Sequence, residues 1–516
     1  MMNNAESWIK VIEIPLIPPS LRDNTADVDR LIKGIKKEIP AQDILVDYDL
    51  IKRIPVILRE SGYKATPILY ESKGLWHLID LLGPGKENII YGVSADIGTS
   101  TVVLRLLNLV NGKTLDETSF LNPQIAIGPD IITRIHFASK DGGLGILQGM
   151  LIERINQEIK SLAKDHGIDI RSIVGMSIAG NTTMTHLFLG LNPYWICREP
   201  YIPVINSPGL VRSSDLGLLT NPRAPVLVLP GAGSYLGGDI IAGVLTSNLY
   251  RQDQVGLLLD VGTNAEVVLG NREWLMACAG AAGPALEGGI AKTGMMAGPG
   301  AIDKVFINPE SRDIQYRTID NLLPVGICGS GMIDMTAQLF LSGMIDQRGK
   351  FIAEACGDRL IEVDGNKYLV VVPSSQTATG KNLTLGQVEI DALLRSKAAM
   401  YTILTTITRM INLSMKDIGQ FYIAGTFGSY INPRSAISIG MIPDIPEEKY
   451  QSLGNTSLNG ASMALLSFRK REAVYYIRDR ITYIELNVNQ DFMNNFNAAK
   501  FIPHTDRDLF PSVRPG

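Results

Sequence analysis

The sequence predicts an α/β fold in which a duplicated, two-lobed unit follows a small α+β domain. Strand and helix patterns alternate from Ile89 onward, which is typical of layered α/β proteins. A strand–turn–strand pattern around Asp96 returns around Asp260, 164 positions later (260 − 96), which indicates an internal duplication. A chain of 516 residues is several times the usual domain size of roughly 100–150, so it holds two or more packed units.

Composition and charge exclude several classes of protein. Hydrophobic residues make up 45% of the chain and charged residues 19%, far from the composition of disordered proteins. The formal net charge of −4 provides no global positive field for nucleic acid or an anionic membrane. No signal-peptide pattern opens the chain, and no stretch of apolar residues is long enough to span a bilayer. We therefore expect a cytoplasmic protein with neither nucleic acid nor membrane as a partner.

The first eighty or so residues predict the small α+β domain. An apolar strand pattern over residues 8–15 precedes helical periodicity over residues 27–37 and a shorter helix from Tyr48, which Pro55 is expected to stop. Two apolar runs, around residues 66–70 and 75–81, are separated by Ser72-Lys-Gly74 and predict a β-hairpin, and Gly83-Pro-Gly85 closes the unit. The predicted divisions are a linker-like segment 1–20, a small α+β middle domain 21–88, a first lobe 89–250, and a second lobe with a C-terminal extension 251–516.

Two glycine-containing hairpins carry the first chemical signal. In each, an apolar strand delivers Asp-(Ile/Val)-Gly-Thr to a turn, and a second apolar strand follows. Glycine lets backbone N–H groups approach a phosphate, and Thr or Ser hydroxyls supply further donors. A carboxylate there would repel phosphate unless Mg²⁺ or its waters lie between them. Asp96 and Asp260 therefore each imply a divalent cation or an oriented water.

Three further glycine-rich segments complete the pattern. Residues 174–183 predict a strand that enters the turn Gly180-Asn181, with a helix beginning near Met184. Residues 323–334 open another helix, whose N-terminus either serves an anion or packs closely. Residues 421–429 predict a buried strand and a turn on which a flat base can lie.

This order of hairpins and turns resembles the superfamily of acetate and sugar kinases, heat-shock chaperone ATPases and actin (ASKHA) over residues 90–440, which implies an actin-like, two-lobed ATPase fold. Other strings resemble the reductive activators of corrinoid proteins, and this resemblance covers nearly the whole chain. These strings are Asn122-Pro-Gln124, Gly128-x-Asp130-Ile-Ile-x-Arg134, Ala281-x-Gly-Pro-Ala-Leu-Glu287-Gly, Gly326-Ile-Cys-Gly-Ser-Gly331, Ser396-Lys397-Ala-Ala and Phe501-Ile-Pro-His504-Thr505.

The second resemblance implies a homodimeric ATPase of anaerobic metabolism. Its ATP would drive the reduction of an inactive Co(II) corrinoid to Co(I) on a partner methyltransferase protein. Asp96 and Asp260 would be the catalytic and Mg²⁺-binding residues. The residues implied in nucleotide binding are Gly98, Thr99, Ser100, Thr101, Gly262, Thr263, Asn264, Glu287, Gly329, Ser330, Gly425, Thr426 and Gly428.

The sequence departs from the family's pattern in the part that would carry the electron. Many members carry an attached ferredoxin-like iron–sulfur domain, whereas the four cysteines here show no cluster spacing. We therefore expect no iron–sulfur cluster in this chain and an electron from a separate ferredoxin or flavodoxin. The alternatives are a truncated sequence or a protein with a shifted role.

Two other functions stay open. A small-molecule kinase typically needs a general-base carboxylate, and the turn after residue 180 offers Asn181, Thr182 and Thr183 instead, which favours the activator. A chaperone-like or filament-forming ATPase lacks an identifiable substrate region. Asp239 is either a helix-start carboxylate or a site residue, and His504 is either structural or a ligand.

Overall fold

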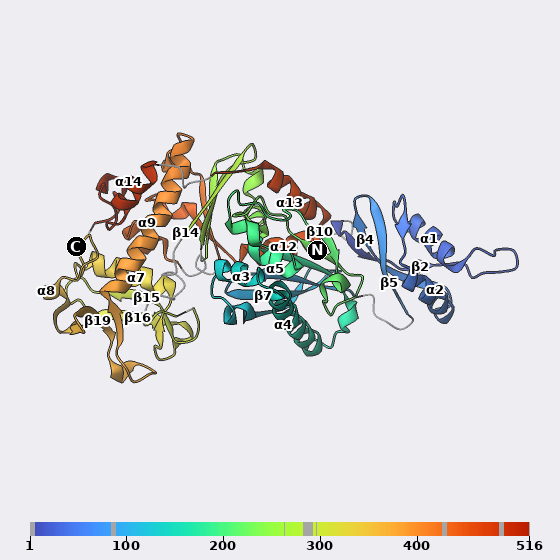
Figure 1. The fold of residues 1–516 in the computed structure, drawn as a ribbon, viewed down its shortest axis with the longest axis horizontal. Coiled ribbons are helices and arrows are strands. Elements are labelled where there is room, and N and C mark those ends of the chain that lie inside the picture. The colour runs from blue at the N-terminus through green and yellow to red at the C-terminus, as the bar shows by residue number, and fades with distance from the viewer. Residues whose placement is uncertain are drawn as a thin grey trace. The chain divides into compact units, whose positions relative to one another are not determined.

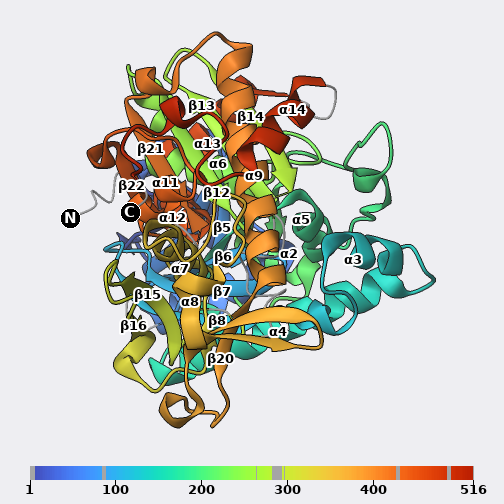
Figure 2. The ribbon, with the colours of Figure 1, turned by 90° about the vertical axis from the view of Figure 1, so that its left-hand side faces the viewer.

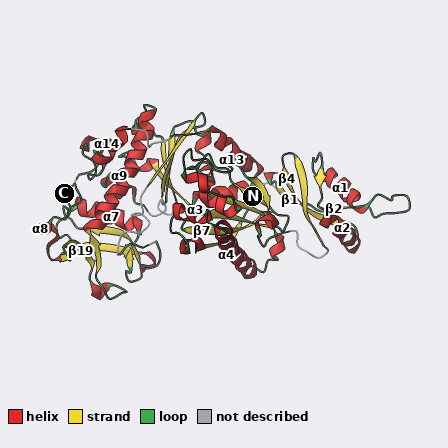
Figure 3. Cartoon of the chain, in the orientation of Figure 1, coloured by secondary structure: helices red, strands yellow, loops and turns green. Residues whose placement is uncertain are grey.

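The computed structural model describes residues 6–83, 89–262, 264–281, 293–295, 297–425, 431–484 and 490–514. The chain divides into two compact units: unit 1 comprises Met1–Thr246 and Ser457–Asp479, and unit 2 comprises Ser247–Thr456 and Arg480–Gly516. Figure 1 traces the chain order, and Figure 3 shows that helices and strands are mixed throughout. Among the described residues, no helix has the length and apolar character needed to cross a membrane.

A small α+β domain begins unit 1, as predicted. Strands β4 (Lys64–Ser72) and β5 (Leu75–Leu82) form the expected hairpin, closed by Lys73 and Gly74, which both have positive φ. Strands β1 (Ile9–Val11) and β2 (Ile14–Pro15) pair with β4, and β3 (Ile44–Leu45) pairs with β5. Helices α1 (Asp27–Glu38) and α2 (Tyr48–Glu60) pack beside this sheet and share one hydrophobic core with it (Figure 1).

The expected stop at Pro55 is wrong, because α2 continues through this residue. Leu50, Ile54 and Leu58 are fully buried at helical spacing in the core of the small domain. A proline inside a helix costs roughly 3 kcal/mol, whereas burying a single leucine contributes about 1.5–3 kcal/mol. The helical turn that follows Pro55 buries Leu58 in the same core. The free energy gained by this packing therefore outweighs the cost of placing proline in the helix.

Both units contain the same five-strand arrangement, so the internal echo in the sequence marks a structural duplication. In unit 1, β6 (Tyr91–Ile97), β7 (Thr101–Asn108) and β8 (Thr114–Leu121) form an antiparallel meander, and β9 (Ile173–Gly180) and β11 (Pro225–Val228) extend the sheet from β6 in parallel. In unit 2, β12 (Gly256–Val261), β13 (Asn264–Gly270) and β14 (Leu275–Ala281) form the meander, and β21 (Gln420–Ala424) and β22 (Tyr450–Gly454) extend it from β12 in parallel.

Each of these sheets has one further strand, and two small sheets lie in unit 2. The sixth strands are β10 (Gly209–Arg212) in unit 1 and β23 (Ile481–Tyr483) in unit 2. The small sheets are β16 (Ile314–Thr318), β15 (Ala301–Ile307) and β17 (Gly326–Ile327), and β18 (Leu360–Val363), β19 (Asn366–Val372) and β20 (Leu383–Gly386).

Helices complete the core of each unit. In unit 1, α4 (Gly143–Asp165) buries one face against the sheet, and in unit 2, α9 (Gln387–Met410) packs on β13 and β14 (Figure 2). The other helices are α3 (Ile131–Ala138), α5 (Thr182–Leu189), α6 (Gly238–Ser247), α7 (Gly329–Leu341), α8 (Ala353–Cys356), α11 (Pro433–Ser438), α12 (Thr456–Leu466), α13 (Phe468–Arg480) and α14 (Gln490–Ala499).

Helices α12 and α13 pack within unit 1 although they follow the sheet of unit 2 in the chain. The indole Nε1 of Trp8 donates to the carbonyl of Ala464 at 2.9 Å. The guanidinium of Arg471 binds both the carbonyl and the carboxylate of Glu71. These contacts attach the small N-terminal domain to the returning helices.

A buried lysine fixes the C-terminal segment to α9. Lys397 is fully buried, and its Nζ donates to the carbonyls of Phe501 at 2.6 Å and Pro503 at 2.7 Å. Burial lowers the pKa of this amine well below its ordinary value, because a charged ammonium loses its hydration there. The hydrogen bonds join two of the sequence strings that carry the resemblance to corrinoid activators.

His504 has a structural environment, which favours the structural interpretation. Its Nδ1 accepts the backbone N–H of Asp506 at 3.0 Å, and its ring packs beside Tyr401 and Phe510. Burial is the main cause that lowers the pKa of the imidazole, followed by the charge of Lys397. The ring is nearly buried, so its contacts serve the packing of this segment.

We expect Lys397→Met to remove a pH-dependent part of the stability. Between the lowered pKa in the folded chain and the ordinary value of 10.5, the unfolded chain binds more protons, so the free energy of unfolding rises with pH in that window. Methionine fills a similar volume without charge. Urea unfolding at about pH 7 and about pH 9.5 should show the wild type gaining stability relative to the variant.

The matched control is Lys33→Met, at an exposed position on α1. Its stability difference from the wild type should not change between the two pH values. A difference for Lys397→Met that is equally constant would contradict the account.

Candidate functional site

The turn of hairpin 1 joins β6 to β7 and holds Gly98, Thr99 and Ser100. All three carbonyl oxygens accept hydrogen bonds from other parts of unit 1, at 2.7–2.9 Å. The amides of Thr99 and Ser100 donate to no atom in the part of the chain that the structure describes. The turn therefore has its acceptors tied to the protein and two backbone donors left for a ligand, as in an anion-binding nest.

Asn122 and Arg134 tie back these carbonyls. The side-chain amide of Asn122 donates to Gly98, and its backbone N–H donates to Ser100, both at 2.9 Å. Arg134 on α3 is fully buried, and its Nη2 donates to the carbonyl of Thr99 at 2.7 Å. Burial lowers the pKa of Arg134 to about 10. Both residues occur in the family-like strings, but no local pattern in the sequence assigns them this supporting role.

Three neighbouring parallel strands of unit 1, β6, β9 and β11, end at one edge of the sheet. Asp96 lies at the end of β6, Asn181 follows β9, and Asp239 lies beyond β11 in the first turn of α6. The Nδ2 of Asn181 donates to the hydroxyl of Thr99 at 3.1 Å, and its Oδ1 caps α5 by accepting the N–H of Met184 at 2.9 Å. Asn181 thus connects hairpin 1 to α5.

Asp239 follows two residues after Gly237, whose backbone lies close to that of Asn181. A Cβ at Gly237 would lie 2.5 Å from the Cα of Asn181, so only glycine permits this approach. The Oδ1 of Asp239 accepts the N–H of Ile240 at 2.8 Å, and burial raises the pKa of the carboxyl to about 6. Asp239 is therefore both a helix-start carboxylate and a member of this edge.

The position of Asp239 removes the argument from the sequence that disfavoured a small-molecule kinase. The turn after β9 contains no carboxylate, which favoured an activator over a small-molecule kinase. The fold nevertheless brings Asp239 to the same edge from a segment almost sixty positions further on (239 − 181 = 58). The absence of a base in the turn is thus no argument against phosphoryl transfer.

Hairpin 2, formed by β12 and β13, has a turn one residue shorter. Residues 262–264 connect Val261 to Ala265, whereas residues 98–101 connect Ile97 to Val102. The N–H of Gly262 donates to the carbonyl of Asn264 at 2.9 Å. The two hairpins are therefore equivalent in strand position and different in turn length.

Gly425 begins the predicted adenosine turn directly beside Asp260. Its φ is +82°, and a Cβ there would lie 2.9 Å from the Oδ1 of Asp260, so both the backbone conformation and the space require glycine. Asp260 itself is partly exposed at the end of β12. The predicted residues Thr263, Glu287, Thr426 and Gly428 lie outside the described residues.

Gly329 and Ser330 open α7 in a closely packed environment. At the next position, a Cβ on Gly331 would lie 2.1 Å from the carbonyl oxygen of Ile302. The thiol of Cys328 also contacts that carbonyl and the hydroxyl of Ser330, each at 3.2 Å. Close packing accounts for this glycine-rich string, and a nucleotide contact by Gly329 or Ser330 stays a prediction.

The residues present suit a magnesium ion only in combination with phosphates. Asp96 and Asp260 each offer a partly exposed carboxylate, and Mg²⁺ is usually held by one or two carboxylates together with waters and substrate phosphates. Over the described ranges, no cluster of three or more His, Cys, Asp or Glu side chains could hold a metal. All four cysteines are free, and Cys278, Cys328 and Cys356 are buried.

Family models cover nearly the whole chain. A model described as the C-terminal domain of RACo, the ASKHA domain, matches residues 254–514. The RACo middle region matches residues 91–252, and the RACo linker region matches residues 4–88. The first of these places an ASKHA domain, a class of nucleotide-binding fold, in the chain.

Similar proteins agree with this assignment. The corrinoid activation enzyme RamQ of Eubacterium limosum is 32% identical over 484 residues, covering 92% of this chain and 79% of that protein. The [Co(II) methylated amine-specific corrinoid protein] reductase of Methanosarcina barkeri is 23% identical, covering 79% of this chain and 76% of that protein. A solved structure, "Reductive activator for corrinoid,iron-sulfur protein", superposes with a TM-score of 0.92 at 38% identity, covering 98% of this chain and 81% of that one.

The chain therefore belongs to the RACo family of reductive activators of corrinoid proteins. The actin-like ASKHA fold, preceded by a small α+β domain, is confirmed.

We expect Arg134→Leu to weaken ATP binding by about tenfold, which corresponds to the loss of roughly one buried hydrogen bond at ~1.4 kcal/mol. Without the guanidinium, the carbonyl of Thr99 has no donor and can turn toward the ligand, where it repels phosphate. Calorimetric titration with ATP and Mg²⁺, at a temperature where the variant is folded by circular dichroism, measures the effect.

The control for destabilisation is Arg223→Leu, which also removes a nearly buried arginine that donates to a carbonyl, that of Ile79 at 2.7 Å. It should lower stability and leave ATP affinity unchanged. Equal losses of affinity in the two variants would show that Arg134 acts through general stability alone.

Proposed function

We propose that the chain is an ATP-dependent reductive activator of a corrinoid protein. It couples hydrolysis of ATP to the one-electron reduction of inactive Co(II) to Co(I) on a methyltransferase partner. The electron comes from a separate low-potential donor, a ferredoxin or a flavodoxin. The observation that carries the proposal is the turn at residues 98–100, with two backbone donors left for a phosphate, in a chain whose relatives are named as corrinoid activators.

We assign both hairpins to nucleotide binding because they hold equivalent positions in the duplicated sheets. The amides and hydroxyls of Thr99 and Ser100 bind phosphate oxygens, and the turn at Gly425 takes the adenosine. Asp96 and Asp260 are the residues that would hold Mg²⁺, and the ion would screen the phosphate charge from the carboxylates and stabilise the leaving group. A contact of Gly329 and Ser330 with the nucleotide belongs to the same proposal.

Hydrolysis requires a group that orients the attacking water and accepts its proton. Asp239 suits this role because its carboxylate lies at the edge that holds Asp96 and Asn181. A pKa of about 6 leaves it ionised at neutral pH yet basic enough to accept a proton. The same carboxylate would serve a kinase, so family membership, rather than this residue, favours hydrolysis over transfer.

In this proposal ATP supplies energy and no phosphate is transferred to a product. A nucleotide shifts a protein between conformations only through different affinities for them. The ATP state therefore binds the partner in a form that favours Co(I), and hydrolysis releases it. A homodimer is part of the proposal, and sedimentation that shows only a monomer would contradict that part.

The function is tested by the visible absorption of a Co(II) corrinoid methyltransferase protein mixed with this chain and a low-potential reductant. The Co(I) band should appear with ATP and Mg²⁺ and stay absent without ATP. Absence of Co(I) despite ATP hydrolysis, across several corrinoid proteins and reductants, would contradict the proposal. A kinase would instead consume ATP in proportion to an added acetate or sugar.

We expect Asp260→Ala to abolish the ATP-dependent formation of Co(I), because it removes a proposed ligand of Mg²⁺. The matched control is Asp253→Ala, which removes an exposed carboxylate shortly before β12 and should have no effect. Unchanged ATP turnover and activation in Asp260→Ala would show that the site is placed wrongly.

We expect Asp239→Asn to slow ATP hydrolysis roughly a hundredfold or more and to stabilise the chain. Raising the carboxyl pKa from 3.8 to about 6 means that the folded chain retains a proton that the unfolded chain loses, so stability falls as pH rises through this window. The amide avoids that cost, on the order of 3 kcal/mol at neutral pH. Phosphate release and thermal unfolding at neutral pH measure the two effects.

Turnover by the wild type should also fall below about pH 6, as Asp239 gains its proton. Asp215→Asn, at an exposed position, is the control and should change neither rate nor stability. Wild-type turnover in Asp239→Asn would rule out the proposed role of this carboxylate.

A further inference from the structure

A glycine-rich loop, residues 231–237, carries the chain from β11 to Asp239 in the first turn of α6. The backbone at residues 237 and 238 packs against Asn181 on one side and Leu229 on the other, at distances that only glycine permits. Such contacts limit how closely the loop approaches the edge of the sheet. They do not hold it there, because atoms in tight contact repel each other on closer approach.

Thr182, the residue after Asn181, supplies an attractive contact to this loop. Its hydroxyl donates to the carbonyl of Gly233 at 2.8 Å, and its side chain is nearly buried. The side chain of Asn181 donates to the hydroxyl of Thr99 in the turn of hairpin 1 at 3.1 Å. Two adjacent residues therefore bind hairpin 1 and the loop that leads to Asp239.

His186, one turn further along α5, supports Thr182 from below. Its Nδ1 lies 2.7 Å from the carbonyl of Thr182, and its Nε2 accepts the backbone N–H of Val204 at 3.1 Å. Since a carbonyl can only accept and an N–H can only donate, the imidazole is neutral with its proton on Nδ1. Burial, which lowers the pKa of His186, agrees with this state. The N–H of Gly231 closes the network by donating to the carbonyl of Asn206 at 2.8 Å.

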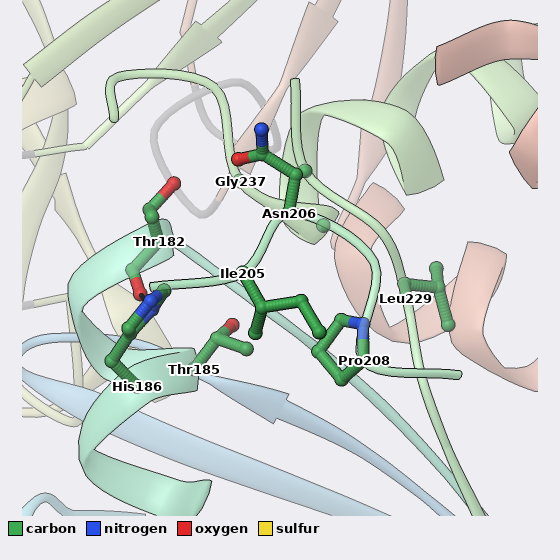
Figure 4. A pocket seen from close by; sticks show the side chains of 10 residues that line it. Thr182, Thr185, His186, Ile205, Asn206, Pro208, Leu229 and Gly237 are labelled. Carbon is green, nitrogen blue, oxygen red and sulfur yellow. Dashed lines mark hydrogen bonds between the residues drawn. The ribbon is translucent and has the colours of Figure 1, made fainter. Parts of the chain in front are cut away.

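The cavity beside this network is too small for a metabolite. Figure 4 shows Thr182, Thr185 and His186 on α5 and Asn206 on the neighbouring segment, all of which line this one cavity. Its volume is about 10 Å³, room for a single water. The hydrogen bonds therefore serve to hold the loop in place, and they do not form a second ligand site.

We propose that Thr182 is a positioning residue for ATP hydrolysis, because its hydrogen bond to Gly233 holds Asp239 where the carboxylate can orient the attacking water. The inference rests on the proposed function, in which the oxygen of that water bonds to the γ-phosphorus, the bond to the β-phosphate oxygen breaks, and the proton of the water goes to Asp239. Thr182 itself touches neither the water nor the nucleotide. Its effect therefore depends on the hydroxyl donor, which serine retains and valine lacks.

The test compares Thr182→Val with Thr182→Ser in ATP hydrolysis by the full chain. Thr182→Val should lower kcat by roughly tenfold or more and leave the KM for ATP unchanged, because Asp239 is misplaced while the phosphate donors are not. Thr182→Ser should retain most of the wild-type rate. The control is Thr185→Val, the same substitution on the same helix, which removes a hydroxyl that donates to Gly180 and not to the loop. It should turn over ATP as the wild type does.

A double variant tests whether Thr182 acts through Asp239. Adding Thr182→Val to Asp239→Asn should slow hydrolysis no further, because no carboxylate is left to position. A further tenfold loss in the double variant would show that Thr182 acts independently of Asp239, which overturns the inference. Circular dichroism at the assay temperature establishes that each variant is folded. If Thr182→Val is not, Thr182→Ala in the same two backgrounds provides the comparison.

The outcomes separate this inference from the proposed function. If Asp239→Asn slows hydrolysis and Thr182→Val turns over as the wild type does, the role of the carboxylate stands and the inference is overturned. A slow Thr182→Ser would show that side-chain shape matters and not the hydroxyl, which also overturns it. If Asp239→Asn has wild-type turnover, the proposed role of Asp239 fails and this inference fails with it. Since every readout is ATP hydrolysis, absence of Co(I) with a corrinoid protein would count against the activator role alone.

Discussion

The buried guanidinium of Arg134 beneath hairpin 1 is the interaction on which the site depends. A turn of three residues has as many acceptors as donors, and its net electrostatic character depends on which of them face the ligand. Arg134 and Asn122 engage all three carbonyls of the turn, and the N–H of Gly98 donates to Thr101, so the amides of Thr99 and Ser100 are left. This arrangement makes a short backbone segment attractive to phosphate without a charged side chain at its surface.

The duplicated topology accounts for where the remaining parts gather. In parallel sheets, successive strands end at one edge, so Asp96, Asn181 and Asp239 reach one edge from segments far apart in the chain. The glycine contacts at residues 237 and 425 bring backbone against that edge in unit 1 and against Asp260 in unit 2. Asn181 also ties this turn to the start of α5, because its side chain donates to the hydroxyl of Thr99 and accepts the N–H of Met184.

The parts that are predictable from sequence are those with a local signal. Strand alternation, the repeated Asp-x-Gly-Thr turns and the Lys73-Gly74 hairpin each lie within about ten residues, and the structure has them as expected. The continuation of α2 through Pro55, the approach of Asp239 and the support from Arg134 depend on contacts between distant segments. No local periodicity or spacing indicates such contacts. The residues are visible in the sequence, but their roles cannot be predicted from it.

In the proposed function, ATP makes the reduction of cobalt easier by changing how the chain binds its partner. The most direct measurement is the midpoint potential of the Co(II)/Co(I) couple of a corrinoid protein, titrated with an excess of this chain and either a non-hydrolysable ATP analogue or ADP. We expect a more positive potential with the ATP analogue, by about 59 mV for each tenfold preference for the Co(I) form. Equal potentials with both nucleotides, in a complex shown to form, would contradict it.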